Sequence, residues 1–253
     1  MTAPRNQWLR LAIFVICLLT IGTRASAEDG NWSFTVAPYA WMSGISGSVA
    51  TVPPLPPGEV DESFSDILDD LEGAFLIYGE ARKDRLFFMT DIVYTDVSAS
   101  DSFGSGGFAT VDVDQENFLI AGAAGYSVIE EPEYRLDLYG GLRYWSIDST
   151  LTLAGPANRR SISYSEDWLD PIAGARLGVP LGENWHFQFT SGIGGFGIGA
   201  DLEWELFSTV RYQLSDWAWV GFGFRYLSVD YESGGFLYDV DQYGPVLGAA
   251  FRF

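Results

Sequence analysis

The sequence predicts an all-β fold, namely a closed antiparallel barrel that spans a membrane, and three observations lead to this prediction. Apolar and polar residues alternate along most of the chain, the connections between the alternating segments are short and long in turn, and aromatic residues make up 16% of the chain despite a formal net charge of −20. Alternation with a period of two is typical of β-strands.

The first segment is excluded from the fold. Two arginines precede an apolar run at 11–21, and the small residues 25–27 follow it. This is the arrangement of a secretory signal peptide. The alternative is a short membrane anchor, but the run is well below the roughly 20 residues that a spanning helix needs. We therefore expect a cleaved signal peptide at 1–27 and a single barrel domain at 28–253.

The predicted mature chain is strongly acidic. Removal of the signal peptide takes away three arginines and no acid, which leaves 11 basic residues against 34 acidic ones. Nucleic acid is therefore not an expected partner. Beyond the signal peptide no apolar run reaches 18 residues, so transmembrane helices are not expected. The apolar residues must be distributed over strands.

Ten strands are expected, with eight or twelve as the nearest alternatives. The alternation within 217–226 shows the pattern, because an apolar face with Phe222 opposes a face of small and charged residues with Gly223. The same pattern places the strands near 31–42, 73–82, 85–97, 110–130, 134–150, 162–180, 185–197, 202–213, 217–231 and 239–253.

The connections favour a membrane barrel over a soluble one. Short turns at 83–84, 131–133, 182–184 and 215–216 alternate with longer loops at about 43–72, 98–109, 151–161, 198–201 and 232–238. Outer-membrane barrels have short periplasmic turns and longer extracellular loops. A β-sandwich or a lipocalin-like barrel shares the period of two. Strand length and aromatic residues near strand ends favour the membrane; these aromatics are Tyr39, Trp41, Tyr144, Trp145, Trp185, Trp204, Tyr212, Trp217 and Tyr226.

Charged residues recur on the polar face of the strands and should line the lumen. Ten strands enclose a narrow lumen, since eight are filled by side chains and 16–18 leave an aqueous channel. We expect a polar lumen that is largely filled by side chains, with a pore lining as the alternative. The candidate lining residues are Glu80, Arg82, Asp91, Arg143, Arg176, Arg211 and Arg225.

The first long loop contains a predicted helix. The stiff segment 52–58 is followed by apolar residues with helical spacing over 64–71, closed by Gly73. This short amphipathic helix would lie on the barrel rim as a lid, or fold into the mouth as a constriction.

Little in the sequence points to catalysis or metal binding. His186 is the only histidine and should lie near the periplasmic rim, and the only cysteine, Cys17, lies in the signal peptide. We expect no enzyme activity, no cofactor and no metal site. Acidic runs at 66–70, 112–116, 166–170 and 239–241 are expected to be solvated. The alternative is weak Ca²⁺ or Mg²⁺ bridging to lipopolysaccharide phosphates.

The carboxyl terminus carries a recognisable pattern. Gly248, Phe251 and the terminal Phe253 occur in the stretch GAAFRF. This pattern resembles the carboxyl-terminal signal of bacterial outer-membrane β-barrel proteins, although the apolar Val246 departs from the polar residue preferred there. The stretches APYAWMSGISGSV and FSDILDDLEGAF are also similar to uncharacterised, porin-like outer-membrane barrel proteins of this size. The resemblance implies recognition by the barrel-assembly machinery.

Three function classes follow from these observations. The first is a structural outer-membrane protein or narrow porin-like channel, and the second is a surface-exposed binding or adhesion barrel that acts through its extracellular loops. A barrel enzyme is disfavoured, because the single histidine is expected at the periplasmic end. Outer-membrane lipid and lipopolysaccharide are the expected surroundings, and a monomer is the expected state.

Overall fold

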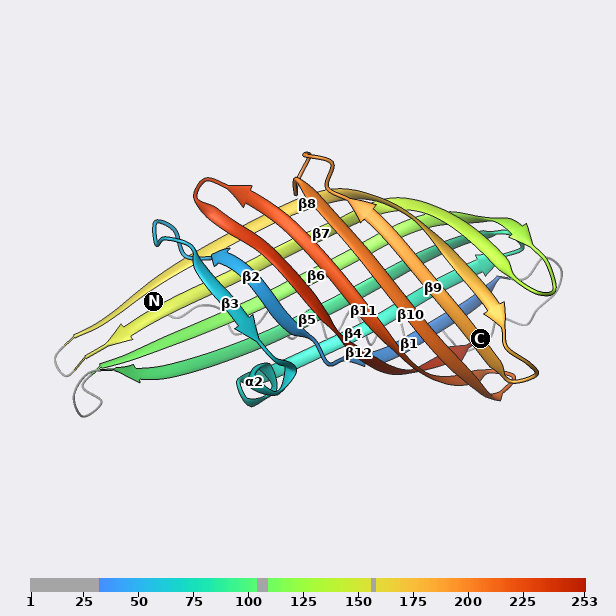
Figure 1. The fold of residues 1–253 in the computed structure, drawn as a ribbon, viewed down its shortest axis with the longest axis horizontal. Helices are drawn as coiled ribbons and strands as arrows, with labels where there is room; N and C mark the ends of the chain where they lie inside the picture. The colour runs from blue at the N-terminus through green and yellow to red at the C-terminus, as the bar shows by residue number, and fades with distance from the viewer. Residues whose placement is uncertain (1–31, 104–108, 156–157) are drawn as a thin grey trace.

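The computed structural model describes residues 32–103, 109–155 and 158–253, and the predicted signal peptide at 1–27 lies outside the described residues. The described residues form an antiparallel 12-stranded sheet and the short helix α2 at Phe64–Asp69 (Figure 1). The strands are β1 (Ser33–Trp41), β2 (Gly44–Ala50), β3 (Gly58–Glu62), β4 (Leu71–Lys83), β5 (Leu86–Phe103), β6 (Ala109–Glu130), β7 (Arg135–Ala154), β8 (Arg159–Pro180), β9 (Trp185–Gly194), β10 (Leu202–Ser215), β11 (Ala218–Ser233) and β12 (Phe236–Arg252).

Ten of these strands close the barrel, which confirms the predicted fold. Strands β4 to β12 pair in chain order, and β1 pairs with β4 on one side and with β12 on the other. The last residue takes part in the closure, because the amide of Phe253 donates to the carbonyl of Phe34 over 2.9 Å. Closure is required in lipid, where each unpaired edge amide would cost several kcal/mol.

The two remaining strands belong to the segment that the sequence predicted as the first long loop. The partner of β12 changes from β1 to β2 between the pairs Trp41↔Val246 and Gly44↔Tyr243. Strands β1 and β2 thus pair with the same side of β12, one after the other, with an interruption at 42–43. Strand β3 adds to the free side of β2. The sequence predicted a loop here because the segment is rich in glycine, serine and proline, which are typical of loops.

The two ends of the barrel differ. The short turns after β4, β6, β8 and β10 lie at the same end as the start of β1 and the carboxyl terminus; we call this the turn end, and the opposite end the loop end. Figure 1 shows β5 to β8 projecting far beyond the other strands at the loop end. In outer-membrane barrels the short turns face the periplasm.

The projecting part of β5 to β8, which we call the outer tongue, corrects the predicted loops at 98–109 and 151–161. Most of these residues are strand. The outer tongue is held by cross-strand hydrogen bonds between short polar side chains, namely Ser98–Asp114 at 2.6 Å, Ser100–Asp112 at 2.7 Å, Thr150–Ser163 at 2.9 Å and Thr152–Ser161 at 2.8 Å. Such pairs stabilise adjacent strands without an apolar core. The predicted loop at 232–238 also shrinks, to a hairpin through Gly234 and Gly235.

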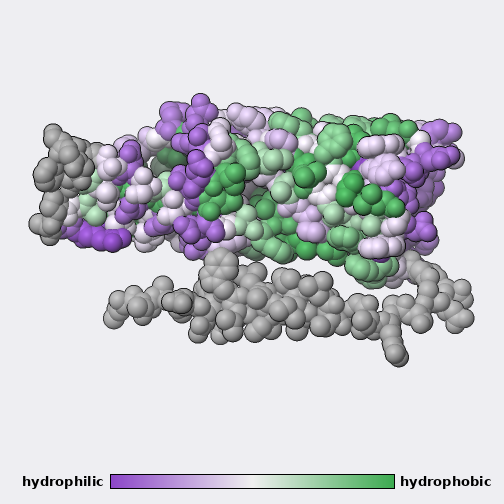
Figure 2. Space-filling view, turned by 90° about the horizontal axis from the view of Figure 1, so that it is seen from below, coloured by the Kyte–Doolittle hydropathy of each residue, from purple (hydrophilic) through white to green (hydrophobic). Residues whose placement is uncertain are grey.

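The outer surface carries an apolar band between two aromatic girdles. Figure 2 shows hydrophobic residues gathered toward the turn end, with hydrophilic residues at the rim beyond them and along the projection on the left. Phe222 is 58% exposed on this band. The loop-end girdle includes the stacked rings of Trp204, Tyr226 and Tyr243, and the turn-end girdle includes the ring pairs Trp185–Tyr212, Trp217–Phe251 and Trp32–Phe88.

Three aromatic residues predicted for the girdles face the interior instead. Tyr39 lines an internal cavity, Trp145 is buried in the core, and the ring of Trp41 lies 4.7 Å from the guanidinium carbon of Arg225. Their positions near strand ends suggested a membrane interface. The direction of a side chain is set by the alternation along its strand and not by its distance from the strand end, and these three positions lie on the inward face.

Helix α2 is shorter than predicted, because it ends at Asp69 and Gly73 lies within β4. Ser63 and Asp66 form a capping box at its start, with the amide of Ser63 donating to the Asp66 carboxylate over 3.0 Å. None of its residues is buried, and Leu68 is 51% exposed. The helix therefore fills no part of the lumen. Among the described residues, no helix is both long and apolar enough to cross a membrane.

Candidate functional site: the barrel lumen

The loop-end half of the lumen is filled by aromatic residues from walls that are not neighbours. We call this group the aromatic plug; its members are Trp145 on β7, Trp168 on β8, Tyr231 on β11, and Phe236 and Tyr238 on β12. The rings of Trp168 and Tyr231 stack with centroids 4.0 Å apart, and those of Trp145 and Trp168 stack at 5.5 Å. The plug is apolar, so the prediction of a polar lumen is wrong for this half.

Hydrogen bonds orient the two tryptophans of the plug. Trp145 Nε1 donates to Glu203 over 3.2 Å, and Trp168 Nε1 donates to Asp170 over 2.9 Å. Asp170 also accepts the amide of Ala200 over 2.7 Å, which ties the β9–β10 loop to the plug. Buried indole N–H groups need such partners.

Next to the plug lies a central ion-pair network built around Arg225. Its guanidinium contacts Asp91 at 2.9 Å and Glu205 at 2.8 Å, and it donates to the Tyr39 hydroxyl over 2.9 Å. The Tyr39 hydroxyl in turn donates to Asp91 over 2.7 Å. Glu205 also accepts from Arg143, which lies 3.4 Å from Glu203. Charges buried in a narrow lumen need partners of this kind.

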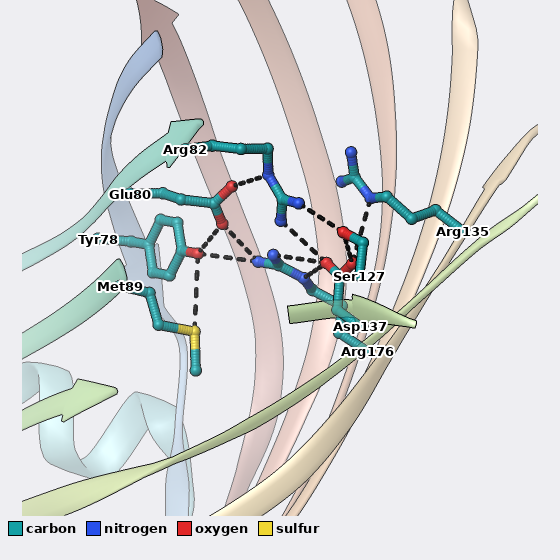
Figure 3. A network of polar contacts seen from close by, with 8 residues as sticks. All are labelled: Tyr78, Glu80, Arg82, Met89, Ser127, Arg135, Asp137 and Arg176. Carbon is teal, nitrogen blue, oxygen red and sulfur yellow. Dashed lines mark hydrogen bonds and ion pairs between the residues drawn. The ribbon is translucent and has the colours of Figure 1, made fainter. Parts of the chain in front are cut away.

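A second ion-pair network lies toward the turn end, with Asp137 at its centre (Figure 3). Asp137 is 1% exposed and accepts from Arg176 over 2.8 Å, from Arg82 over 3.0 Å and from the Ser127 hydroxyl over 2.6 Å. Glu80 completes the group, because it accepts from Arg82 over 2.9 Å and from Arg176 over 2.6 Å. Two carboxylates thus hold two guanidinium groups side by side.

The buried ring of Phe87 packs against both arginines of this turn-end network. The guanidinium carbons of Arg82 and Arg176 lie 4.4 Å and 4.5 Å from its centroid, within the range of cation–π contact. The ring occupies the space left by Gly125 on the neighbouring strand, since a Cβ atom at Gly125 would lie 2.2 Å from Phe87 Cζ. The glycine is therefore required for the ring position.

A cavity of about 620 Å³ occupies the rest of the lumen. Its lining runs from Tyr39, Arg143 and Arg225 in the central network to Pro132 and Gln213 beside the turns. No member of the aromatic plug lines it. The cavity therefore belongs to the turn-end half, and the plug separates it from the loop end.

The structure places all seven candidate lining residues around this one cavity. Glu80, Arg82 and Arg176 join in the turn-end network, and Asp91, Arg143 and Arg225 join in the central network. Arg211 stands apart, with no hydrogen bond or ion pair to any described residue, and its buried Nε is unpartnered. His186 pairs with Arg211 across β9 and β10 at the turn end.

Several key residues of the two networks are not among the lining residues that the sequence predicted. Asp137, Glu203 and Glu205 supply most of the carboxylates, while Tyr78 and Ser127 supply hydroxyl groups. Alternation could have found the acids, because Asp137 is an even number of positions from Arg143 on β7, and Glu205 from Arg211 on β10. Their partners on distant strands could not be read from spacing along one strand.

The predicted assembly signal occupies the turn-end residues of β12 and Phe253, which follows the strand. Gly248 pairs with Tyr39 on β1 and with Gly221 on β11. The ring of Phe251 lies 6.1 Å from that of Trp217 on the outer surface, and Phe253 is 73% exposed.

Comparison with known proteins decides the class of barrel. No protein-family model matches the sequence, and no curated protein sequence matches it. Among solved structures, the translocator domain of the autotransporter NalP from Neisseria meningitidis is similar, with a TM-score of 0.53, 14% identity, and 98% of each chain covered. The chain has the fold of an outer-membrane β-barrel.

Other outer-membrane barrels match less closely. Ail, the attachment invasion locus protein of Yersinia pestis, has a TM-score of 0.37 and 14% identity, with 88% of this chain and 98% of that chain covered. The Pseudomonas putida toluene transporter TodX has a TM-score of 0.33 and 11% identity, with 89% and 90% covered. Likeness at this level says nothing about the function of this chain.

The acidic runs do not converge on a metal site within the described residues. No group of three or more His, Cys, Asp or Glu side chains there is arranged to hold a metal ion. In the outer tongue, Asp112 and Asp114 accept hydrogen bonds from serines of β5.

Proposed function

We propose that this protein is an integral outer-membrane barrel with a structural role, whose lumen is closed at the loop end. The observation that carries the proposal is the aromatic plug, in which Trp168 stacks on Tyr231 between strands that are not neighbours. The apolar band and the two girdles suit a lipid environment, with outer-membrane lipid and lipopolysaccharide around it.

The plug favours a structural barrel over a narrow channel. An open channel would need a continuous polar path, but the cavity borders the central network and includes no plug residue. A path through the plug would have to displace Trp168 from the rings of Tyr231, Trp145 and Phe236, whose centroids lie 4.0, 5.5 and 6.3 Å from its own. It would also have to break the hydrogen bonds of the two indole N–H groups to Glu203 and Asp170.

Conductance in planar bilayers tests this proposal. The folded wild-type protein should show no steady conductance steps, whereas Trp168→Ala combined with Tyr231→Ala should produce them by emptying the stack. Leu153→Ala is the matched control, because Leu153 is an exposed apolar residue of the outer tongue. Steady steps in the wild-type protein would instead favour the porin-like channel.

The outer tongue supports a second candidate function, a surface-binding or adhesion role. Strands β6, β7 and β8 have 20 to 22 residues each, about twice the roughly 9–11 that a tilted strand needs to cross the membrane. The extra length presents hydrogen-bonded strands outside the membrane. A binding assay with two kinds of cell tests this role. Cells with the full protein should bind a host or surface ligand, whereas cells whose protein lacks the part of the outer tongue beyond the loop-end girdle should not. Equal binding would reject the role.

We also propose that the carboxyl-terminal aromatic ring is read by the barrel-assembly machinery. The backbone of Phe253 is already bonded to Phe34 in both directions, at 2.9 Å and 3.1 Å, so the exposed ring is not needed for that pairing. Phe253→Ala should lower the amount of folded barrel in the outer membrane, and Phe253→Tyr should not. Normal levels of Phe253→Ala with normal export would contradict the proposal.

A further inference from the structure

We infer that the turn-end cavity is a binding site for a small anionic solute that carries a phosphate or carboxylate group and enters from the periplasmic side. The inference is independent of the proposed closed lumen, because a site that opens at the turn end needs no path to the loop end.

The charge of the cavity is opposite to the charge of the chain. Seven arginines line it, against four carboxylates from Glu80, Asp91, Glu131 and Glu205, whereas the whole chain has 34 acidic and 14 basic residues. The buried Asp137 and Glu203, which pair with lining arginines but do not line the cavity, add two further carboxylates, so seven arginines face six carboxylates. The excess of guanidinium groups is therefore a local feature of the lumen.

The excess lies at the turn end. In the central network the carboxylates of Asp91, Glu203 and Glu205 at least match Arg143 and Arg225. Toward the turns, Arg82, Arg135 and Arg176 share Glu80 and Asp137, and two more arginines have no carboxylate partner among the described residues. These two are Arg211 and Arg252, which both line the cavity.

Arg211 is held in place without being neutralised. Its side chain runs over Gly221 on the neighbouring strand, where a Cβ atom would come within 3.0 Å of Arg211 Cγ. Its Nε is buried and unpartnered. An unpaired guanidinium group in a confined space is costly unless a solute or solvent completes its hydrogen bonds. The glycine thus makes room for a cation that the protein itself leaves unpaired.

Further groups around Arg211 suit an oxyanion. Arg252 lies at the cavity mouth, with its guanidinium carbon 4.7 Å from the ring centroid of Trp219, an arrangement that leaves its N–H edges free for a ligand. Gln188 and Gln213 line the same region and supply neutral amide donors. Guanidinium groups match phosphate and carboxylate oxygens geometrically, and charge-assisted hydrogen bonds are about twice as strong as neutral ones.

The size of the site limits the ligand to a small molecule. The cavity of about 620 Å³ falls within the roughly 300–1,000 Å³ of typical ligand sites. It extends to Pro132 and Tyr134 beside the β6–β7 turn, so its mouth lies at the turn end. A periplasmic solute with one or two oxyanion groups fits this space and charge.

Calorimetric titration of the folded protein in zwitterionic detergent tests the inference, with inorganic phosphate and citrate as separate probes at constant ionic strength. At least one probe should bind saturably. Arg211→Gln should weaken that binding by about tenfold or more, because it removes a charge-assisted contact. Arg85→Gln is the matched control, because Arg85 lies in a turn at the same end, outside the cavity lining, and its one ion pair within the described part of the chain is with Glu130 at 3.6 Å.

A second variant keeps the test decisive if Arg211→Gln does not fold, as judged by heat-dependent gel mobility. Arg252→Gln changes an exposed residue and should also weaken binding. A phosphate-only or citrate-only response identifies the preferred group. The inference is overturned if neither probe saturates, if Arg85→Gln weakens binding as much as the cavity variants do, or if sodium chloride competes as well as the probes do.

Discussion

The ring of Trp168 lies flat on the ring of Tyr231, with centroids 4.0 Å apart and planes 9° from parallel, although the two residues sit on strands that do not pair. This contact joins two sides of the barrel interior. The contact should therefore stabilise the folded barrel as well as block the loop end of its lumen.

Trp168→Ala should destabilise the barrel. The substitution leaves a cavity among Trp145, Tyr231 and Phe236, and truncation of a buried large aromatic residue costs about 3–5 kcal/mol. Guanidinium unfolding in lipid vesicles measures this cost. Trp217→Ala, at an exposed girdle position, provides the comparison and should cost less. Equal losses of unfolding free energy in the two variants would show that the packing of Trp168 in the plug does not stabilise the barrel.

Phe222→Arg tests which face of β11 meets lipid. An arginine at the middle of the apolar band should cost about 2–4 kcal/mol of unfolding free energy. Gly223 is unsuitable as a control, since a Cβ atom there would lie 2.1 Å from the carbonyl oxygen of Ser208. Leu153→Arg is better, because Leu153 is exposed on the outer tongue beyond the girdle, and it should cost little. A smaller loss for Phe222→Arg than for Leu153→Arg would refute the assigned lipid face.

Gly125→Ala should destabilise the barrel by about 1–3 kcal/mol, as overpacking does in tight cores. The added methyl group would meet Phe87 and move the ring that supports two arginines. Gly122→Ala on the same strand is the matched control, because a Cβ atom there meets nothing within 4 Å. The urea unfolding midpoint of Gly125→Ala should be lower than that of Gly122→Ala. Identical midpoints would show that the close contact between residue 125 and Phe87 does not affect stability.

Asp137→Asn should cost about 3 kcal/mol, because it removes the buried carboxylate that Arg82 and Arg176 share and leaves Glu80 as the one carboxylate that pairs with both. Glu130→Gln removes one carboxylate from the exposed pair with Arg85 and should cost no more than about 1 kcal/mol. Both free energies come from the same unfolding titration. The expectation fails if the two substitutions cost the same.

The capping box of α2 should make this helix sensitive to acid. Hydrogen bonds from the Ser63 hydroxyl and amide lower the pKa of Asp66 below its ordinary value. Because the folded pKa is the lower one, the cap stabilises the helix above the pKa of the unfolded chain. This stabilisation is lost as pH falls through the folded pKa. Nuclear magnetic resonance titration of Asp66 should show a higher pKa in Ser63→Ala; an unchanged pKa would contradict this account.

Sequence alone predicted the barrel because lipid imposes a simple rule on the wall. Apolar residues such as Phe222 and Leu247 must face outward at every second position, and this alternation is visible along the strands that form the closed barrel. The same rule put the charged residues in the lumen. The ends of the strands in the outer tongue were assigned to loops because serine, threonine, glycine and acidic residues, which are frequent there, are typical of loops, although apolar and polar residues still alternate at 111–114 and 150–153.

The contents of the lumen were harder to predict, because they depend on contacts across the barrel. Arg225 pairs with Asp91, which is 134 positions earlier in the chain, and Arg176 pairs with Glu80 from a distant strand. The aromatic plug was missed for the same reason, since Trp145 near the end of an expected strand resembles a girdle residue. Alternation identifies the inward face but not the partner that each inward side chain meets.

The position of β12 has a consequence for how the sheet is completed. This strand alone pairs with β11 along its length, with β1 over one half and with β2 over the other. A chain that lacks β12 leaves unpaired edges both in the membrane and outside it. A single strand, β12, thus completes both parts of the described sheet, the closed barrel in the membrane and the added strands outside it.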